Sequence, residues 1–179
     1  MKLKEFIYLP NFISKEEESE LITALSNLPL QEVKMYGMTA KRKVMHYGLD
    51  YTYNSRTVTP TTAPPPFIVS LIKKSAVILD IQPEAIVETL ITLYPIGAGI
   101  GWHKDAPIFG NKIFGISLGS ECILKLRKKT DDGFVIIKKT LEPRSAYILS
   151  DDVRWVWQHS IPPVKQLRYS ITFRMKNSA

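Results

Sequence analysis

The sequence lacks the features of a secreted or membrane-spanning chain. It contains a single cysteine, Cys122, so no internal disulfide bond can form, and the apolar run around it predicts a buried thiol. No apolar stretch reaches the roughly 18 residues that a membrane span needs. The apolar run near the N-terminus is also too short for a signal peptide. We therefore expect a cytoplasmic or nuclear protein without membrane association.

The sequence also lacks internal repeats and low-complexity segments, and its length suits one folded domain. Of the 179 residues, 45% are hydrophobic and 23% are charged, which is ordinary for a folded chain with a full core. We expect one domain over residues 1–179, active as a monomer. Residues 1–85 would form a helical part with a lid, and residues 86–176 a strand-rich core.

Basic residues outnumber acidic ones by 24 to 17, and the isoelectric point is near 9.4. Such a balance favours a polyanionic partner such as nucleic acid. The excess is spread along the chain, however, so it equally fits a merely basic soluble protein. Charge supports a nucleic-acid partner without establishing it.

Two helices are predicted in the first half of the chain. Ser14 and Glu17 have the spacing of a capping box, and apolar residues at helical spacing follow, which predicts a helix over residues 15–28. Apolar residues recur at intervals of three and four from Phe67 to Leu79, which predicts a second helix before residues 82–83.

The second half of the chain is typical of short β-strands. We predict seven runs without intervening helices, at residues 86–94, 113–118, 121–127, 133–140, 145–149, 153–158 and 167–175. Residues 119–120 and 131–133 are predicted as tight connections between neighbouring strands. This pattern is mainly β and predicts a sandwich or jelly roll, with the two helices covering one sheet from outside.

Candidate metal ligands follow the first of these strands. His103 and Asp105 are two residues apart, so on a strand they share a face, and His159 can complete a three-point facial site for Fe(II) with open coordination positions. Each residue also has an ordinary interpretation. His103 can be a loop histidine bonded to Asp105, and His159 a residue at a strand end.

The last predicted strand carries a candidate anion site. Arg168, Ser170, Thr172 and Arg174 alternate and so share one face, with no acidic residue between the arginines. The two guanidinium groups could hold opposite ends of a small dicarboxylate. The alternative is two solvated arginines on an outer strand face.

Together these motifs resemble the AlkB family of Fe(II)- and 2-oxoglutarate-dependent dioxygenases. The resemblance rests on four ordered blocks, at residues 92–105, 117–120, 154–159 and 168–174, and less specifically on residues 42–48. It implies a double-stranded β-helix with the N-terminal helices and lid packed against it. It also implies iron ligands and cosubstrate-binding residues. The ligands would be His103, Asp105 and His159, and the cosubstrate residues Thr92, Tyr94, Arg168, Ser170 and Arg174.

The chemistry implied by the resemblance couples decarboxylation of 2-oxoglutarate by O2 to hydroxylation of a C–H bond. An N-methyl group treated in this way leaves as formaldehyde. A base must leave its stack to reach the iron, so a lid with flat side chains is expected. The lid lies in segment 34–53, where basic and aromatic residues mix. The same segment can equally be an edge hairpin whose tyrosine rings pack inward. The substrate-lid candidates are Arg42, His46, Tyr47, Tyr51 and Trp102.

The chain departs from the family pattern at positions that bear on the substrate. Thr92 stands where the cosubstrate motif usually has Asn, which removes an amide but keeps a hydroxyl. Pro107 stands where some base-repair members have an acidic residue that contacts the base. Segment 34–53 also contains no Trp. These differences weaken the substrate prediction more than the cofactor prediction.

Three hypotheses follow from the sequence. The leading one is oxidative demethylation of N-alkylated bases in single-stranded DNA or RNA, with Fe(II), 2-oxoglutarate and O2. The second is hydroxylation of a modified tRNA nucleoside, or of a protein or lipid. The third is a jelly-roll binding module without catalysis, which the intact set of His103, Asp105, His159 and Arg168 disfavours.

Overall fold

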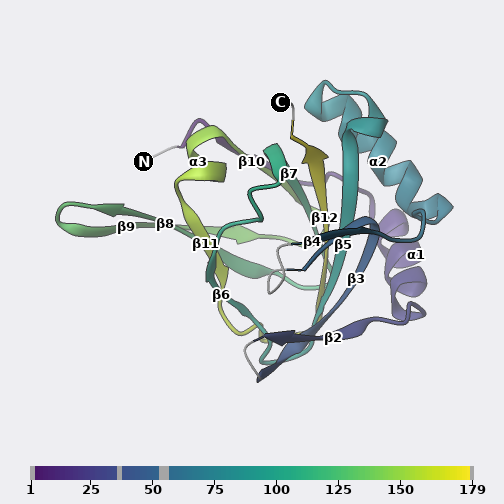
Figure 1. Cartoon of the computed structure of the whole chain (residues 1–179). Helices are drawn as coiled ribbons and strands as arrows, with labels where there is room; N and C mark the ends of the chain where they lie inside the picture. The colour runs from purple at the N-terminus through teal and green to yellow at the C-terminus, as the bar shows by residue number, and fades with distance from the viewer. Residues whose placement is uncertain (1–2, 36–37, 53–56, 178–179) are drawn as a thin grey trace.

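The computed structural model describes residues 3–35, 38–52 and 57–177 as two antiparallel β-sheets with two helices on one side (Figure 1). The helices are α1 (Lys15–Ser26), α2 (Pro66–Leu79), the single 3-10 turn η1 (Pro83–Ala85) and α3 (Asp151–Trp155). The strands are β1 (Phe6–Leu9), β2 (Gln31–Met35), β3 (Met38–Thr52), β4 (Thr57–Pro60), β5 (Ile86–Tyr94), β6 (Ile100–His103), β7 (Phe109–Leu118), β8 (Cys122–Thr130), β9 (Gly133–Leu141), β10 (Ala146–Ser150), β11 (Gln158–Ile161) and β12 (Arg168–Lys176).

The sheets have the arrangement of a jelly roll, as predicted. The major sheet has the strand order β1-β10-β7-β12-β5-β3-β2, with β4 paired to β3, and the minor sheet has the order β6-β11-β8-β9. Strand β12, which carries both candidate arginines, lies between β5 and β7 in the major sheet. The cosubstrate motif and the arginine motif are therefore neighbours in space although about eighty residues separate Tyr94 from Arg174.

Both predicted helices form and cover the outer face of the major sheet (Figure 1). Helix α1 starts with the expected reciprocal capping box, in which the Ser14 hydroxyl accepts from the Glu17 backbone and the Glu17 carboxylate accepts from the Ser14 backbone. It ends at Ser26, two residues before the prediction. Helix α2 starts at Pro66, where the missing N–H is tolerated, and ends before Asp80 in a left-handed conformation. None of the helices within the described ranges is both long and apolar enough to cross a membrane.

The sheets and helices create two cores. The helix-side core contains Leu25, Leu71 and Tyr47 with the outward residues of the major sheet, and the inter-sheet core contains Leu124, Leu126 and other apolar residues of the minor sheet. Side chains alternate along a strand, so the residues that precede and follow a helix-side residue in the sequence point into the space between the two sheets. The inner face of β12, with Arg168 and Arg174, therefore looks into the molecule and is buried. The interpretation as solvated outer arginines is wrong.

Two sequence predictions are corrected here. The predicted strand 153–158 is instead helix α3 followed by β11, because Ser150 precedes two acidic residues that suit a helix start, while the apolar residues at 153, 155 and 157 imitate strand alternation. Residues 119–120 do not join paired strands, since β7 and β8 belong to different sheets. Residues 131–133 do lie at the predicted hairpin between β8 and β9.

The predicted lid segment is an integral part of the major sheet. Strand β3 pairs with β2, β4 and β5, so this segment forms the edge hairpin that was the alternative interpretation. Gly48 in β3 has φ +80°, and a Cβ there would meet the carbonyl oxygen of Val87 at 2.3 Å, so only glycine fits. Tyr36, Gly37 and Tyr53 of the predicted lid lie outside the described residues.

Candidate active site

The fold brings the three predicted iron ligands together. His103 at the end of β6 is the direct cross-strand partner of His159 on β11, and their ring centroids are 4.1 Å apart. Nε2 of His159 lies 3.5 Å from Oδ2 of Asp105. Between His159 and Ile161 the register shifts by a bulge, which lets both Ile100 and His103 of β6 face inward.

The protonation states of these residues suit a cation. Burial lowers the pKa of His103, and it lowers the pKa of His159 to about 3, so both rings are neutral at neutral pH. Burial is the strongest single influence on the pKa of Asp105 and would raise it, but Arg174 and the neighbouring basic groups together outweigh burial and keep the carboxylate ionised. Nδ1 of His103 lies 2.9 Å from the carbonyl oxygen of Gly101, which can only accept. The proton therefore resides on Nδ1, and the lone pair on Nε2 is left for a metal ion.

Arg174 links the candidate ligand Asp105 to a buried network. Its guanidinium donates to Oδ1 of Asp105 from Nε, at 2.8 Å, and also from a terminal nitrogen. The other terminal nitrogen donates to Oε2 of Glu88 at 2.6 Å. Nδ1 of His46 then lies 3.0 Å from Oε1 of Glu88. Glu88 is only 1% exposed, so the guanidinium of Arg174 and the hydrogen bond with His46 supply the partners that its burial requires.

The loop that carries Asp105 is held by Arg154 of α3. This arginine is 3% exposed and donates to the backbone carbonyls of Asp105 at 3.2 Å, Ala106 at 2.7 Å, Phe109 at 3.2 Å and Gly110 at 3.2 Å. One side chain thus satisfies carbonyls that the loop would otherwise bury unpaired. Arg154 belongs to block 154–159 of the family resemblance, but only the tertiary structure reveals that it holds the loop of Asp105.

Arg168 is the central residue of the candidate cosubstrate site. It is fully buried, and its Nε donates to Oγ of Ser117 at 3.0 Å. Its two terminal nitrogens have no hydrogen-bond partner within the described ranges. The guanidinium lies 5.1 Å from the ring centroid of Tyr94, its partner on β5. A buried guanidinium without an anion is costly, and a carboxylate is the group that matches its forked geometry.

Other predicted and unpredicted residues lie near Arg168. Thr92 and Ser170 are cross-strand partners and are buried, and their contact with a cosubstrate stays a prediction. Tyr147 lies over Gly115, where a Cβ would come within 2.5 Å of its ring, so the glycine makes room for the phenol. Burial raises the pKa of Tyr147 while Arg168 opposes it, so this hydroxyl stays protonated as a hydrogen-bond donor. Sequence reasoning missed Tyr147, Ser117 and Glu88 as site residues. Ser117 did belong to block 117–120 of the family resemblance, and its alternation with Leu118 was a second available signal.

The lid candidates separate into two groups. His46 reaches the site through Glu88. The positive charge of Arg42 acts on both Tyr94 and His103: it opposes the burial that raises the pKa of Tyr94 and adds to the burial that lowers the pKa of His103. The Tyr51 ring lies 6.4 Å from the Phe109 ring, which itself lies against the guanidinium of Arg174. These three residues are on the side of the iron ligands.

Tyr47 and Trp102 are placed elsewhere. Tyr47 follows His46 and so points to the opposite face of β3, where it is 5% exposed within the helix-side core. Trp102 precedes His103 and packs on Arg127, 4.5 Å from its guanidinium, on the outer face of the minor sheet. Neither ring faces the ligand residues, which corrects the lid assignment for both.

The residues fit iron and 2-oxoglutarate to different degrees. Two neutral imidazoles and one carboxylate are the donor set of a facial Fe(II) site, and Arg168 supplies the unpaired cation for a dicarboxylate. Within the described part of the chain, however, no group of three His, Cys, Asp or Glu side chains is already arranged to hold a metal ion. The identity of the three ligands therefore stays a prediction.

Comparisons with known proteins show the family to which the chain is similar. Residues 5–174 match the family model described as the 2OG-Fe(II) oxygenase superfamily. The chain is 27% identical over 177 residues to an Arabidopsis thaliana protein named "Alkylated DNA repair protein ALKBH8 homolog", covering 86% of this chain and 49% of that protein. It is 25% identical over 166 residues to a Xenopus tropicalis "tRNA (carboxymethyluridine(34)-5-O)-methyltransferase alkbh8", covering 89% of this chain and 25% of that protein.

A solved structure and a viral relative extend the comparison. The solved structure, titled "The structure of OsALKBH1", superimposes with a TM-score of 0.75 at 16% identity, covering 98% of this chain and 99% of that one, which shows the shared fold. A protein of Acanthamoeba polyphaga mimivirus, "Uncharacterized protein L905", is 36% identical over 111 residues, covering 54% of this chain and 50% of that protein. The chain thus spans half or less of the length of these curated relatives.

Proposed function

We infer that this chain, which belongs to the 2OG-Fe(II) oxygenase superfamily and within it to the AlkB family of dioxygenases, oxidises bases in single-stranded nucleic acid. The leading reaction is oxidative demethylation of an N-alkylated base in DNA or RNA. The observation that carries the proposal is the buried Arg168, whose terminal nitrogens have no hydrogen-bond partner among the described residues and which shares a strand face with Arg174, the partner of Asp105.

The protein's own residues have distinct parts in this reaction. His103, Asp105 and His159 would hold Fe(II), which with 2-oxoglutarate and O2 supplies the oxidising power when bound. Arg168 would pair with a carboxylate of 2-oxoglutarate, and the Tyr94 hydroxyl would donate to it. Arg174 keeps Asp105 ionised and oriented, while Arg154 fixes the loop behind it. Asp105 therefore faces the site in one orientation.

The nucleic-acid substrate is supported by two half-buried residues near the candidate ligands. Arg42 and Tyr51 combine a cation with a flat ring near the ligand residues, a combination that suits a base turned out of its stack beside its phosphate. The excess of 24 basic over 17 acidic residues agrees with a polyanion. The names of the relatives refer to alkylated DNA repair and to tRNA.

In the proposed reaction, the two atoms of O2 enter different products. One atom of O2 enters succinate as 2-oxoglutarate loses CO2, and the other enters a C–H bond of the N-methyl group. The resulting N-hydroxymethyl group loses formaldehyde, and the proton from its hydroxyl returns to the ring nitrogen. The base leaves one CH2 unit lighter, and each turnover produces one succinate.

The test is product analysis with the purified chain, Fe(II), ascorbate and 2-oxoglutarate on a panel of methylated DNA and RNA oligonucleotides. We expect formaldehyde in proportion to succinate, and none from His103→Ala with an unchanged unfolding midpoint. Succinate without formaldehyde on every oligonucleotide would rule out demethylation. Failure to form succinate at all, in protein shown to be folded, would rule out the oxygenase site.

Hydroxylation of a modified tRNA nucleoside is the second candidate, and two observations favour it. A relative is named for carboxymethyluridine at position 34 of tRNA, and Pro107 replaces an acidic base contact of some repair members. Mass spectrometry of digested tRNA after reaction would then show a nucleoside that has gained one oxygen. Loss of a methylene unit from the same nucleoside would contradict it.

A further inference from the structure

The outer face of the minor sheet is basic and aromatic, and it lies opposite the iron ligands. Leu124 and Leu126 of β8 point into the inter-sheet core and are at most 1% exposed. Lys125, Arg127 and Lys129 alternate with these leucines and must therefore point outward. Their cross-strand partners on β9 lie on the same outer face and are Lys138, Ile136 and Phe134. The outer face comprises Trp102, Lys125, Arg127, Lys129, Phe134, Ile136 and Lys138.

A rigid stack of flat groups crosses this face. The guanidinium of Arg127 lies 4.5 Å from the ring centroid of Trp102 and 4.5 Å from that of Phe134. Nε of Arg127 also donates to Oε1 of Gln158 at 2.8 Å, which fixes the plane of the guanidinium. Phe134 is nevertheless 52% exposed. Preformed flat surfaces of this kind can stack on nucleobases without regard to sequence.

Among the residues that the structure describes, the lysines of the outer face form no ion pairs. Within the described ranges, no carboxylate lies within ion-pair distance of Lys125, Lys129 or Lys138, and neither β8 nor β9 contains an acidic residue. Three cations on one face without a partner favour a polyanion from outside.

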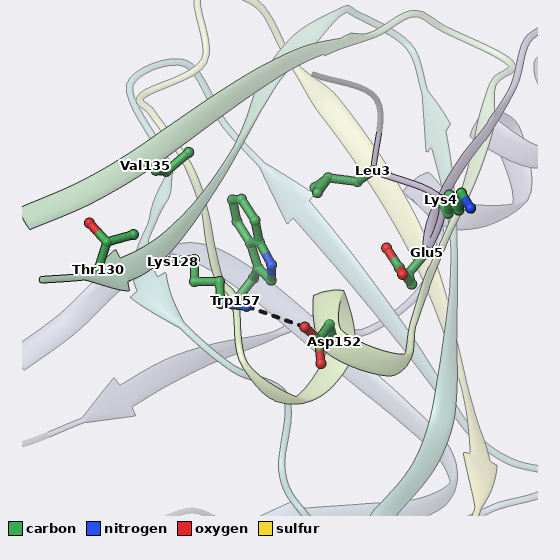
Figure 2. Close-up of a pocket in the computed structure, with 8 residues that line it drawn as sticks. All are labelled: Leu3, Lys4, Glu5, Lys128, Thr130, Val135, Asp152 and Trp157. Carbon is green, nitrogen blue, oxygen red and sulfur yellow. Dashed lines mark hydrogen bonds and ion pairs between the residues drawn. The ribbon is translucent and has the colours of Figure 1, made fainter.

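The opposite face of the same hairpin behaves differently. There Lys128 forms an ion pair with Asp152 at 3.2 Å, in the pocket that Val135 and Trp157 also line (Figure 2). Lys139 lies 3.7 Å from the ring centroid of Tyr8. The cations on this face therefore have partners inside the molecule. Within the described part of this hairpin, the lysines without a partner inside the molecule are therefore those of the outer face.

The outer face continues into a hollow beside β6. Gly101, Trp102, Lys125, Ser160 and Pro162 are among the residues that line it. Strand β6 is an edge strand of the minor sheet, and its His103 points to the other face. A strand of nucleic acid lying on the outer face could therefore pass over β6 toward the ligand residues without crossing a paired strand.

We propose that the outer face of the minor sheet binds a single strand of nucleic acid, with phosphates at Lys125, Lys129 and Lys138 and bases on Phe134 and in the hollow beside Trp102. The choice of nucleic acid over another polyanion rests on the proposed function. The surface is separate from the iron site and would hold the nucleotides that flank the reacting base.

The test is fluorescence anisotropy of the full chain with unmodified single-stranded RNA and DNA oligonucleotides, without iron or 2-oxoglutarate. We expect Lys125→Gln with Lys138→Gln to weaken binding roughly tenfold and to reduce the salt slope by about 1.4, since each phosphate contact contributes about 0.7. Phe134→Ala should weaken binding roughly five- to hundredfold. The matched control is Lys15→Gln with Lys73→Gln on α1 and α2, on the other side of the molecule, which should bind like the wild type (Figure 1).

Several outcomes would overturn the proposal. An equal loss in both double variants would mean that only net charge matters. Wild-type binding with no loss in any outer-face variant would overturn the surface while leaving the proposed function intact. If the wild type binds no oligonucleotide and forms no product from one, both proposals fail. Tighter binding of an acidic polypeptide than of the oligonucleotides would assign the face to a protein partner instead.

Discussion

Nε of Arg168 donates to Oγ of Ser117 at 3.0 Å, and this single bond holds a fully buried guanidinium whose terminal nitrogens point to no described partner. This unfavourable arrangement lies on the inner face of the major sheet, where a dicarboxylate could pair with the two terminal nitrogens of Arg168. Stability and binding should therefore respond in opposite directions when the arginine is changed.

Arg168→Met is expected to stabilise the ligand-free chain by about 1–3 kcal/mol, because it removes an unpaired buried cation while keeping an unbranched side chain. Chemical unfolding with a constant m-value checks this. The same variant should lose about 2–5 kcal/mol of 2-oxoglutarate binding. Saturating 2-oxoglutarate should accordingly raise the unfolding midpoint of the wild type but not of the variant. A destabilised variant that still responds to 2-oxoglutarate would contradict the assignment.

Glu88→Gln tests the network behind the iron ligand. The carboxylate accepts from Arg174 at 2.6 Å and faces His46 at 3.0 Å, so its neutral replacement leaves a buried cation short of charge. We expect the free energy of unfolding to fall by about 3–5 kcal/mol. Iron affinity should fall as well, because the Glu88 carboxylate no longer helps to hold the guanidinium of Arg174 in place beside Asp105. Glu20→Gln on the exposed side of α1 is the control, and an equal loss there would remove the argument.

Tyr51→Ala and Tyr47→Ala form a matched pair on one strand. Tyr51 lies toward Phe109 and the site, so its loss should raise KM for an oligonucleotide substrate with little change in the unfolding midpoint. Tyr47 is buried among the helix-side residues, so its loss should cost about 3–5 kcal/mol of stability by leaving a cavity. Oligonucleotide turnover and thermal unfolding of both variants separate the two effects. The reverse pattern would mean that β3 is placed one residue out of register.

Stability of the iron-free chain should decrease in acid. The pKa of His159 is about 3 in the folded chain against 6.5 for a free histidine, so between these values the unfolded state binds a proton that the folded state does not. Stability is therefore complete above pH 6.5 and is lost as the pH falls through this window. The lowered pKa of Asp105 acts in the same direction below its ordinary value of 3.8. Unfolding midpoints from pH 6.5 downward, with a chelator present, measure the slope. His159→Gln should show a shallower slope, and an equal slope would place the sensitivity elsewhere.

Local features of the chain were readable from the sequence. The reciprocal bonds of Ser14 and Glu17 depend on residues three apart, and the shared face of Arg168 and Arg174 depends only on strand alternation. The buried thiol of Cys122 followed from its apolar neighbours. Each of these features is set within one element, so the chain itself contains the needed information.

What alternation could not supply is the pairing between distant strands. The sequence placed Arg168 and Arg174 together as a candidate clamp, but the register against β5 puts Glu88 opposite Arg174 and Tyr94 opposite Arg168. Only then does one arginine acquire carboxylate partners while the other keeps two free nitrogens. A bulge near His159 likewise lets both Ile100 and His103 face inward, although they are three positions apart on β6. Shifting a strand by one residue reverses every side chain, so the faces are determined by packing between strands far apart in the sequence.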